Sequence, residues 1–576
     1  MKHIKEPRYK NILLAIISLI VVAFYIHRPL LYSKGEHYFP YKHFDEMIYL
    51  AKVTQIASGN SPDGNCILNN QFENKKSLYP IYTEKYLAGI YKTFSLTPRS
   101  FIFLLYLFCP LFILWGLYML IHSFKLDKSY NMFPVLLAGL LMTGVLFLKP
   151  YFSQPDIGGY IFPFERYLNP LLNVIPTIFY FAGLARLLVN KQPSFKYIVL
   201  TGLFGGLTFY TNVYYYLINA IVMILFFILS SIFWRNKILA FLYAGLITLL
   251  VASPVIYHVL AGPKIEYALE KMWVVGLLLP FKNVAYLTHK GMILIILSSL
   301  FLFIFNKKYK QVSLLILILQ SLVYAFSNLS VIFNKIFLTL HFQYFNIITF
   351  VLFYLILLEI LKERLIGVKI FYKYWNVIPL TLSLLIIFIS LNRTLNDKTK
   401  LNEMNTTIEK RASLVNLIGK HYSKKIFLAP LDFSSMILAQ SDVQLYTDRF
   451  MNFCDLRPEE LLDRNILYFK IYQKENYIIN KQCEYYWPWA GFVTDEFKKI
   501  NTSCHKYNDY IQSKLGGFKV SEYQIKLSSD HSSIDYILQD RSAYFDHKLV
   551  NQLFQTSIII ENKFWTLYKV NKLVTQ

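Results

Sequence analysis

The sequence is poor in charged residues, which excludes an ordinary soluble protein. Of its 576 residues 16% are charged and 55% are hydrophobic, and the mean hydropathy is +0.38. Soluble globular proteins usually carry about a quarter charged residues. The chain also lacks the glycine-rich loop that cradles phosphate in P-loop and dinucleotide-binding proteins, which argues against a nucleotide-driven pump. Its five cysteines show no zinc-binding spacing.

Acidic residues are scarce relative to basic ones, with 35 Asp and Glu against 59 Lys and Arg, a net charge of +24. The excess is not spread evenly. Residues 393–576 carry 25 basic and 21 acidic residues, a net of +4, so +20 belongs to the remainder of the chain. Basic loops beside apolar segments contact anionic lipid headgroups. The charge therefore indicates membrane lipids and no nucleic acid as partners.

Long apolar runs place the chain among polytopic α-helical membrane proteins, because a span needs roughly 20 mostly apolar residues. The runs predict about eleven spans, at 11–26, 101–121, 131–148, 167–189, 197–210, 213–233, 238–258, 291–305, 312–326, 345–361 and 375–392.

The loops between these spans indicate how the chain crosses the membrane. With a cytoplasmic N-terminus, six inner segments hold 17 cations, at positions 2, 5, 8, 10, 125, 128, 191, 196, 235, 237, 307, 308, 310, 362, 364, 369 and 373. The short outer loops hold seven, at 149, 166, 264, 271, 282, 290 and 335. Cytoplasmic loops of membrane proteins are enriched in Lys and Arg. With an odd number of spans this predicts an extracytoplasmic C-terminus, in a bacterial inner membrane or an endoplasmic reticulum membrane.

The chain divides into two predicted domains. Residues 1–392 form the transmembrane domain, whose first outer loop, 27–100, is too long and apolar for a plain connector. Residues 393–576 have a soluble composition and predict a mixed α/β domain, with strands at 425–430 and 443–446 and a hairpin over 557–568. Cys483 and Cys504 are the favoured disulfide pair on the outer side.

The most informative segment of the first outer loop is 38–53. From Asp45 onward its apolar residues recur with helical spacing, and the adjacent Asp45 and Glu46 lie at the expected helix N-terminus. A helix N-terminus favours an ionised carboxylate, as a general base or a cation ligand requires. The alternative is that Asp45 only caps the helix.

A second candidate segment, 149–170, lies on the predicted outer face and is irregular, with four prolines and a Gly158-Gly159 pair. Irregular backbone near a bilayer is tolerated only when it is buried in protein or lines a wet cavity. Arg166 enters the following span, where its planar guanidinium is suited to grip a phosphate. It could instead pair with Glu165 or with a lipid phosphate at the interface.

Weaker candidates lie near the outer ends of later spans. His258 ends a span ahead of Glu266 and Glu270, although simple interfacial placement explains it as well. The glycines of 202–207 predict close helix packing. The tyrosines that follow, through residue 216, form either an interfacial belt or the lining of a groove.

At this point the chain resembles the GT-C superfamily of membrane glycosyltransferases. The shared pattern is a cytoplasmic N-terminus, one span, a long outer loop bearing an acidic pair (here Asp45-Glu46), many further spans and a terminal outer domain. The segments 44–49 and 166–170 also resemble those of bacterial multi-spanning proteins grouped with these enzymes.

The resemblance implies transfer of a sugar from a polyprenyl-phosphate donor to a glycan, lipid or protein acceptor on the extracytoplasmic face. In the inverting reaction the acceptor hydroxyl displaces the phosphate in one step, which needs a carboxylate base and a cation. Asp45 and Glu46 would be catalytic, and Arg166 would bind the donor phosphate. Glu46 and Asp156 could also support the site or hold a divalent metal, and further supporting roles would fall to His43, Glu165 and His258.

Two other classes of protein share this outline. A non-catalytic transporter of lipid-linked glycans or an envelope-assembly scaffold is one. Transporters show paired repeats and broken helices at the midplane, whereas this sequence shows no repeat and its charged candidates lie at the outer boundary. An O-antigen-type polymerase or ligase is the other, although its large outer loop is flanked by spans.

Overall fold

The computed structural model describes the chain in blocks. They are 44–59, 82–124, 172–211, 213–261, 290–328, 345–365, 398–422, 425–430, 443–446, 458–472, 513–529 and 534–574, with single residues 15, 18, 19, 22, 23, 26, 126, 433, 436 and 437.

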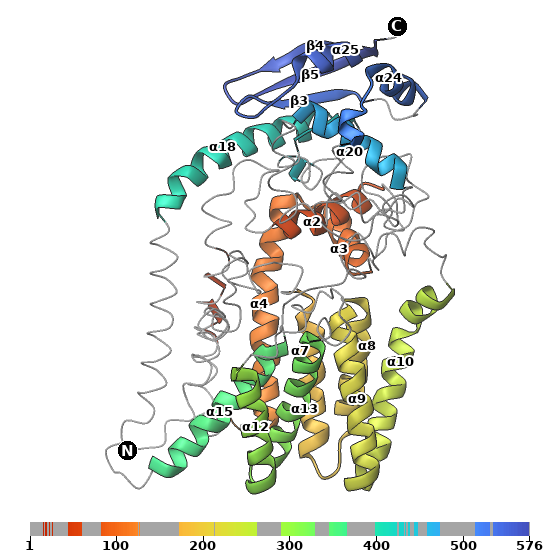
Figure 1. The fold of residues 1–576 in the computed structure, drawn as a ribbon. Helices are drawn as coiled ribbons and strands as arrows, with labels where there is room; N and C mark the ends of the chain where they lie inside the picture. The colour runs from red at the N-terminus through yellow and green to blue at the C-terminus, as the bar shows by residue number, and fades with distance from the viewer. Residues whose placement is uncertain are drawn as a thin grey trace.

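A bundle of apolar helices forms the lower part of the molecule (Figure 1). Its described helices are α4 (Pro98–Ser123), α7 (Val174–Val189), α8 (Phe195–Leu207), α9 (Val213–Phe233), α10 (Ile238–Ala261), α12 (Lys290–Phe305), α13 (Lys310–Ser327) and α15 (Asn346–Leu365). Four helical stretches among the described residues are long and apolar enough to cross a membrane: Pro98–Ser123, Tyr214–Phe233, Arg235–His258 and Lys310–Ser327. The chain is thus an integral membrane protein.

Eight of the predicted spans coincide with these helices. The predicted span 11–26 is described at only a few residues, and those at 131–148 and 375–392 lie outside the described residues. The total of eleven spans therefore stays a prediction.

Glycines allow α7, α8 and α10 to approach closely, as the sequence predicts for 202–207. A Cβ added at Gly202 would lie 2.6 Å from the Cβ of Ile247, and one at Gly206 would lie 2.4 Å from the Cβ of Val251. Small residues let backbones approach where lipid supplies no hydrophobic drive for association. The pair α8–α10 thereby forms a rigid block that fixes where α8 ends.

The C-terminal region contains a five-stranded sheet in the order β2-β1-β3-β5-β4. Its strands are β1 (Ile426–Leu428), β2 (Gln444–Leu445), β3 (Tyr536–Asp540), β4 (Phe554–Glu561) and β5 (Trp565–Leu573). The first three are parallel, whereas β3–β5 and β5–β4 are antiparallel. The predicted strands at 425–430 and 443–446 and the predicted hairpin are confirmed. The same region contains four helices: α18 (Lys398–His421), α20 (Pro458–Tyr472), α24 (Val520–Ser529) and α25 (His547–Leu553).

Two helices of the first predicted outer loop, α2 (Phe44–Ala57) and α3 (Tyr82–Thr93), lie between the bundle and the sheet (Figure 1). They pack on each other. We call the end of the bundle that they cover, marked by Tyr210 and His258, the sheet-facing end. The other end, marked by Lys308 and Glu363, is the opposite end.

Candidate functional site

Helix α2 carries the acidic pair predicted from the sequence. It begins at Phe44, so Asp45 and Glu46 lie in its first turn, and the predicted helix is confirmed. The contacts of these two side chains lie outside the described residues. The backbone N–H groups of a first helical turn and the helix dipole favour a carboxylate in its ionised form. Position on the helix therefore suits Asp45 to accept a proton or to hold a cation.

The rest of α2 is held firmly in the protein. Leu50, Ala51 and Val53 are buried. Beyond them, the buried Gln55 donates a hydrogen bond from Nε2 to the carbonyl oxygen of Val443, 3.3 Å away and just before β2. Contact with the sheet region on one side and with α3 on the other fixes the direction in which α2 presents its first turn.

Helix α3, which packs on α2, carries a buried carboxylate. Glu84 lies on the side of α3 that also buries Leu87 and Ala88. Burial raises the pKa of the Glu84 carboxyl, while the positive charge of Lys52 on α2 acts in the opposite direction. Buried carboxyl groups with shifted pKa values concentrate at functional sites, although structural roles also produce them.

An aromatic cluster joins α3 to the sheet-facing end of the bundle. The ring of Tyr82 packs edge-on against those of Tyr210 and His258, at centroid distances of 5.6 and 5.7 Å. Thr83 Oγ1 donates to the carbonyl oxygen of Tyr210 at 2.6 Å, in the short helix η5 (Thr208–Tyr210) that follows α8. The Tyr210 hydroxyl in turn donates to the carbonyl oxygen of Val251 on α10 at 2.9 Å.

The hydroxyl of Tyr82 is the chemically unsatisfied group of this cluster. Its Oη is buried and has no hydrogen-bond partner among the described residues. Burial, with Tyr210 as a smaller contribution, raises its pKa, so the group stays a neutral hydroxyl. Because buried polar groups are normally hydrogen-bonded, a water molecule or a polar ligand group is the expected partner.

Of the predicted site residues, the structure brings His258 into this cluster and places Asp45 and Glu46 on the adjoining helix. His43, Asp156, Glu165 and Arg166 lie outside the described residues. Cys483 and Cys504 do so as well, whereas Cys109 is a buried free thiol.

Sequence reasoning missed Glu84 and Tyr82. A signal was present, because Glu84, Leu87, Ala88 and Tyr91 follow the spacing of one helix face. A carboxylate in that series is a candidate for burial.

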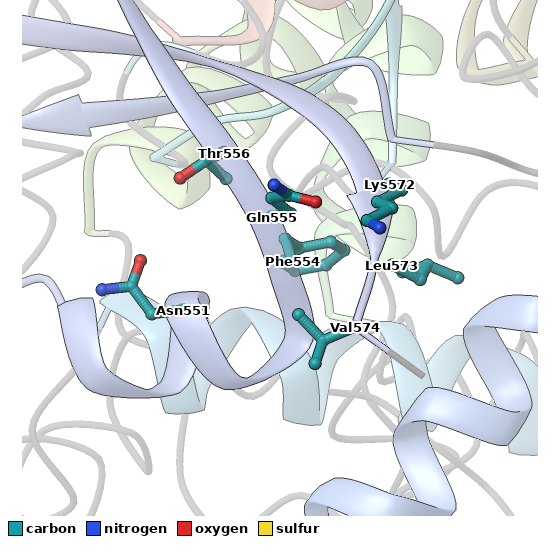
Figure 2. A pocket seen from close by; sticks show the side chains of 7 residues that line it. All are labelled: Asn551, Phe554, Gln555, Thr556, Lys572, Leu573 and Val574. Carbon is teal, nitrogen blue, oxygen red and sulfur yellow. The ribbon is translucent and has the colours of Figure 1, made fainter. Parts of the chain in front are cut away.

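The described residues were also compared with two other kinds of site, a metal centre and a surface pocket. No group of three metal-binding side chains occurs among the described residues. A pocket does lie in the sheet region, between the end of α25 and the outer hairpin of the sheet, lined by Asn551, Phe554, Gln555, Thr556, Lys572, Leu573 and Val574 (Figure 2). Its lining holds no carboxylate or histidine, so it offers no acid–base pair.

No protein-family model matches the chain, and no curated protein sequence matches it. Among solved structures, the crystal structure of ArnT from Cupriavidus metallidurans bound to undecaprenyl phosphate is similar to it. ArnT is a GT-C glycosyltransferase. The alignment covers 97% of this chain and 97% of that one, with a TM-score of 0.49 and 11% sequence identity.

Proposed function

We propose that this protein is an inverting glycosyltransferase that moves a sugar from a polyprenyl-phosphate donor to an acceptor on the extracytoplasmic face of the membrane. One observation carries the proposal. The helix whose first turn bears Asp45 and Glu46 is packed between the sheet region and α3, which is itself fixed to the sheet-facing end of the bundle.

That position suits a lipid-linked donor. The phosphate of such a donor lies at the membrane surface, with its sugar toward water and its chain in the bilayer. A group that attacks the anomeric carbon must therefore act beside the ends of the spans. Tyr210 and His258 mark those ends, and both contact α3. Side chains from α2 and α3 are thus near the level at which the bond would break.

The roles follow from the chemistry of displacement. In an inverting transfer the acceptor oxygen bonds to the anomeric carbon as the carbon–phosphate oxygen bond breaks, and the hydroxyl proton leaves with a base. Asp45 is the proposed base. Arg166 is the proposed partner of the departing phosphate, whose growing charge it would stabilise. Glu46, His43, Asp156, Glu165 and His258 are proposed to hold these groups in place, and Glu46 and Asp156 are the carboxylates that a divalent cation would use.

The test is transfer by the purified full chain in lipid vesicles, supplied with a panel of polyprenyl-phosphate sugars labelled in the sugar. In Asp45→Asn the side chain keeps its size and loses its charge, which in a first helical turn contributes only about 0.3–1 kcal/mol. Loss of a positioned base typically costs about 10²–10⁴ in rate. We expect a protein of parental abundance and thermal stability whose transfer rate falls by that factor.

Glu46→Gln is the matched control, because it removes the neighbouring carboxylate from the same turn. A milder loss supports Asp45 as the base, whereas equal losses point to a cation held by both. Parental transfer by Asp45→Asn would refute the assignment. If the parental protein only moves the labelled lipid across the bilayer, the transporter class is correct instead.

A further inference from the structure

The pocket in the sheet region lies at a corner where a helix passes directly into a strand. Helix α25 ends at Leu553 and β4 begins at Phe554, and both side chains are buried. The backbone N–H of Val574, just after β5, donates to the carbonyl oxygen of Leu553 at 3.0 Å. Gln524 on α24 donates from Nε2 to the carbonyl oxygen of Gln552, also at 3.0 Å. The corner is therefore held in place from β5 and from α24.

A β-bulge at this corner brings two consecutive polar side chains to the pocket. Gln555 pairs with Lys572 on β5. The next residue, Thr556, pairs with Val570, which leaves Asn571 as an extra residue of β5. Successive residues of a regular strand point to opposite faces, yet Gln555 and Thr556 both line the pocket (Figure 2). Bulges twist a strand and change the direction of its side chains, and they are frequent next to binding sites.

The polar side chains of the pocket are available to a ligand. Four of them form no hydrogen bond or ion pair with another of the described residues: those of Asn551, Gln555, Thr556 and Lys572. Two carboxamides, each with donors and an acceptor, and one hydroxyl suit a ligand rich in hydroxyl groups. Among the lining residues only Lys572 is charged. The pocket therefore favours an anionic ligand over a cationic one.

The size and the apolar part of the lining indicate the class of ligand. The cavity has a volume of about 390 Å³, near the lower end of the roughly 300–1,000 Å³ of ligand pockets. Phe554, Leu573 and Val574 add apolar surface beside the polar groups. A sugar ring matches this combination, because its hydroxyl groups surround faces made of C–H groups. A lipid chain would leave the amides and the ammonium group without partners.

We propose that this corner is a binding site for an acidic saccharide. Its hydroxyl groups bond to the amides of Asn551 and Gln555, and its carboxylate or phosphate lies at Lys572. Figure 1 shows α25 and β4 on the side of the sheet region away from the helix bundle. The site is therefore separate from the proposed catalytic residues on α2, and binding there does not depend on the protein being a transferase.

An oligosaccharide array tests the proposal with the full chain in lipid nanodiscs. The array carries sugars with a uronic acid, sugar phosphates and the matching neutral sugars. The variants are Asn551→Leu, Gln555→Met and Lys572→Gln. The matched control is Lys569→Gln, which removes the same charge from the same strand outside the pocket lining. All four side chains are exposed, so each variant should keep the parental thermal midpoint.

We expect the parent to bind acidic sugars and each amide variant to lose about tenfold in affinity, the effect of one lost hydrogen bond. Lys572→Gln should weaken binding of the acidic sugars and leave that of the neutral ones unchanged, whereas Lys569→Gln should bind as the parent does. Because no transfer is measured, this result is independent of the proposed function.

Three results would overturn the proposal. The first is that the parent binds no sugar of the array, and the second is that the two lysine variants have equal effects. The third is that inorganic phosphate competes as well as the free acidic sugar, or that an acidic peptide binds as tightly, since the pocket would then recognise charge and not a saccharide.

Discussion

The two ends of the bundle handle buried polar groups differently. At the opposite end, Lys308 pairs with Glu363 on α15, and its Nζ lies 3.7 Å from Oε2 of the buried Glu359. Lys237 donates to the carbonyl oxygen of Leu188 in the last turn of α7. At the sheet-facing end, Glu84 is buried and desolvation outweighs the positive charge of Lys52, while the Tyr82 hydroxyl has no partner among the described residues.

The two ends differ in whether their buried polar groups stabilise the fold or cost it stability. At the opposite end the carboxylates have a cationic partner, although Oε1 of Glu359 has no hydrogen-bond partner among the described residues. A buried carboxyl with a raised pKa and an unsatisfied hydroxyl cost stability, and such costs are typically retained where a ligand or a reaction uses the groups. The contrast is a further reason to look for the site at the sheet-facing end.

Replacement of Arg166 is expected to give the largest effect after that of Asp45. Arg166→Lys keeps the charge but loses the planar fork, and a hydrogen bond to a charged group contributes about 1.5–3 kcal/mol. We expect donor use to fall roughly tenfold or more at parental expression, measured as the transfer rate against donor concentration. The control is Arg186→Lys on α7, whose guanidinium lies 5.5 Å from the centre of the Tyr197 ring. Equal kinetics for the parent and Arg166→Lys would remove Arg166 from the site.

Close packing behind the sheet-facing end can be disturbed without touching a charged group. Gly206→Ala would push a methyl group against Val251, and overpacking of this kind typically costs 1–3 kcal/mol. The shift would also move Tyr210, the acceptor for Thr83. We expect a lower midpoint of thermal unfolding in lipid.

Gly245→Ala on α10 is the matched control for that change. No atom lies within 4 Å of a Cβ added there, so the midpoint should be unchanged or raised. A parental midpoint for Gly206→Ala would show that α8 and α10 are less tightly packed than their glycines indicate.

Local patterns in the sequence predicted much of this architecture. The apolar runs predicted the helices of the bundle, the spacing after Asp45 predicted α2, and the glycines of 202–207 predicted the α8–α10 contact. Each of these features depends on residues close together in the chain. The candidate site does not: Gln55 and Val443 are separated by 388 positions. The burial of Glu84 likewise requires α2 to pack on α3, which no local pattern specifies.

The pH dependence of stability should reveal the carboxyl of Glu84. Its folded pKa is raised above an ordinary value near 4.5. The protonated native state is therefore favoured, and this contribution is complete below the unfolded pKa and is lost as pH rises through the folded pKa. Glu84→Gln should remove that loss, so its thermal midpoint should equal or exceed that of the parent at neutral pH. A Glu84→Gln protein that is less stable at neutral pH would show that the ionised carboxylate is the form stabilised in the fold.

Glu363 at the opposite end should show the reverse sign and the smallest effect. The hydrogen bond from Lys308 holds the pKa of the Glu363 carboxyl below its ordinary value, and the hydroxyl of Tyr309 donates to the same oxygen at 3.2 Å. This stability is present above the unfolded pKa and is lost as pH falls through the folded pKa. Because both partners are about half exposed, solvent screening limits the pair to about 0.2–1 kcal/mol. Glu363→Gln should therefore lower the thermal midpoint slightly at neutral pH and leave it unchanged in acid, while transfer stays at the parental rate. If Glu363→Gln and Glu84→Gln shift the midpoint in the same direction at neutral pH, the contrast between the two ends is wrong.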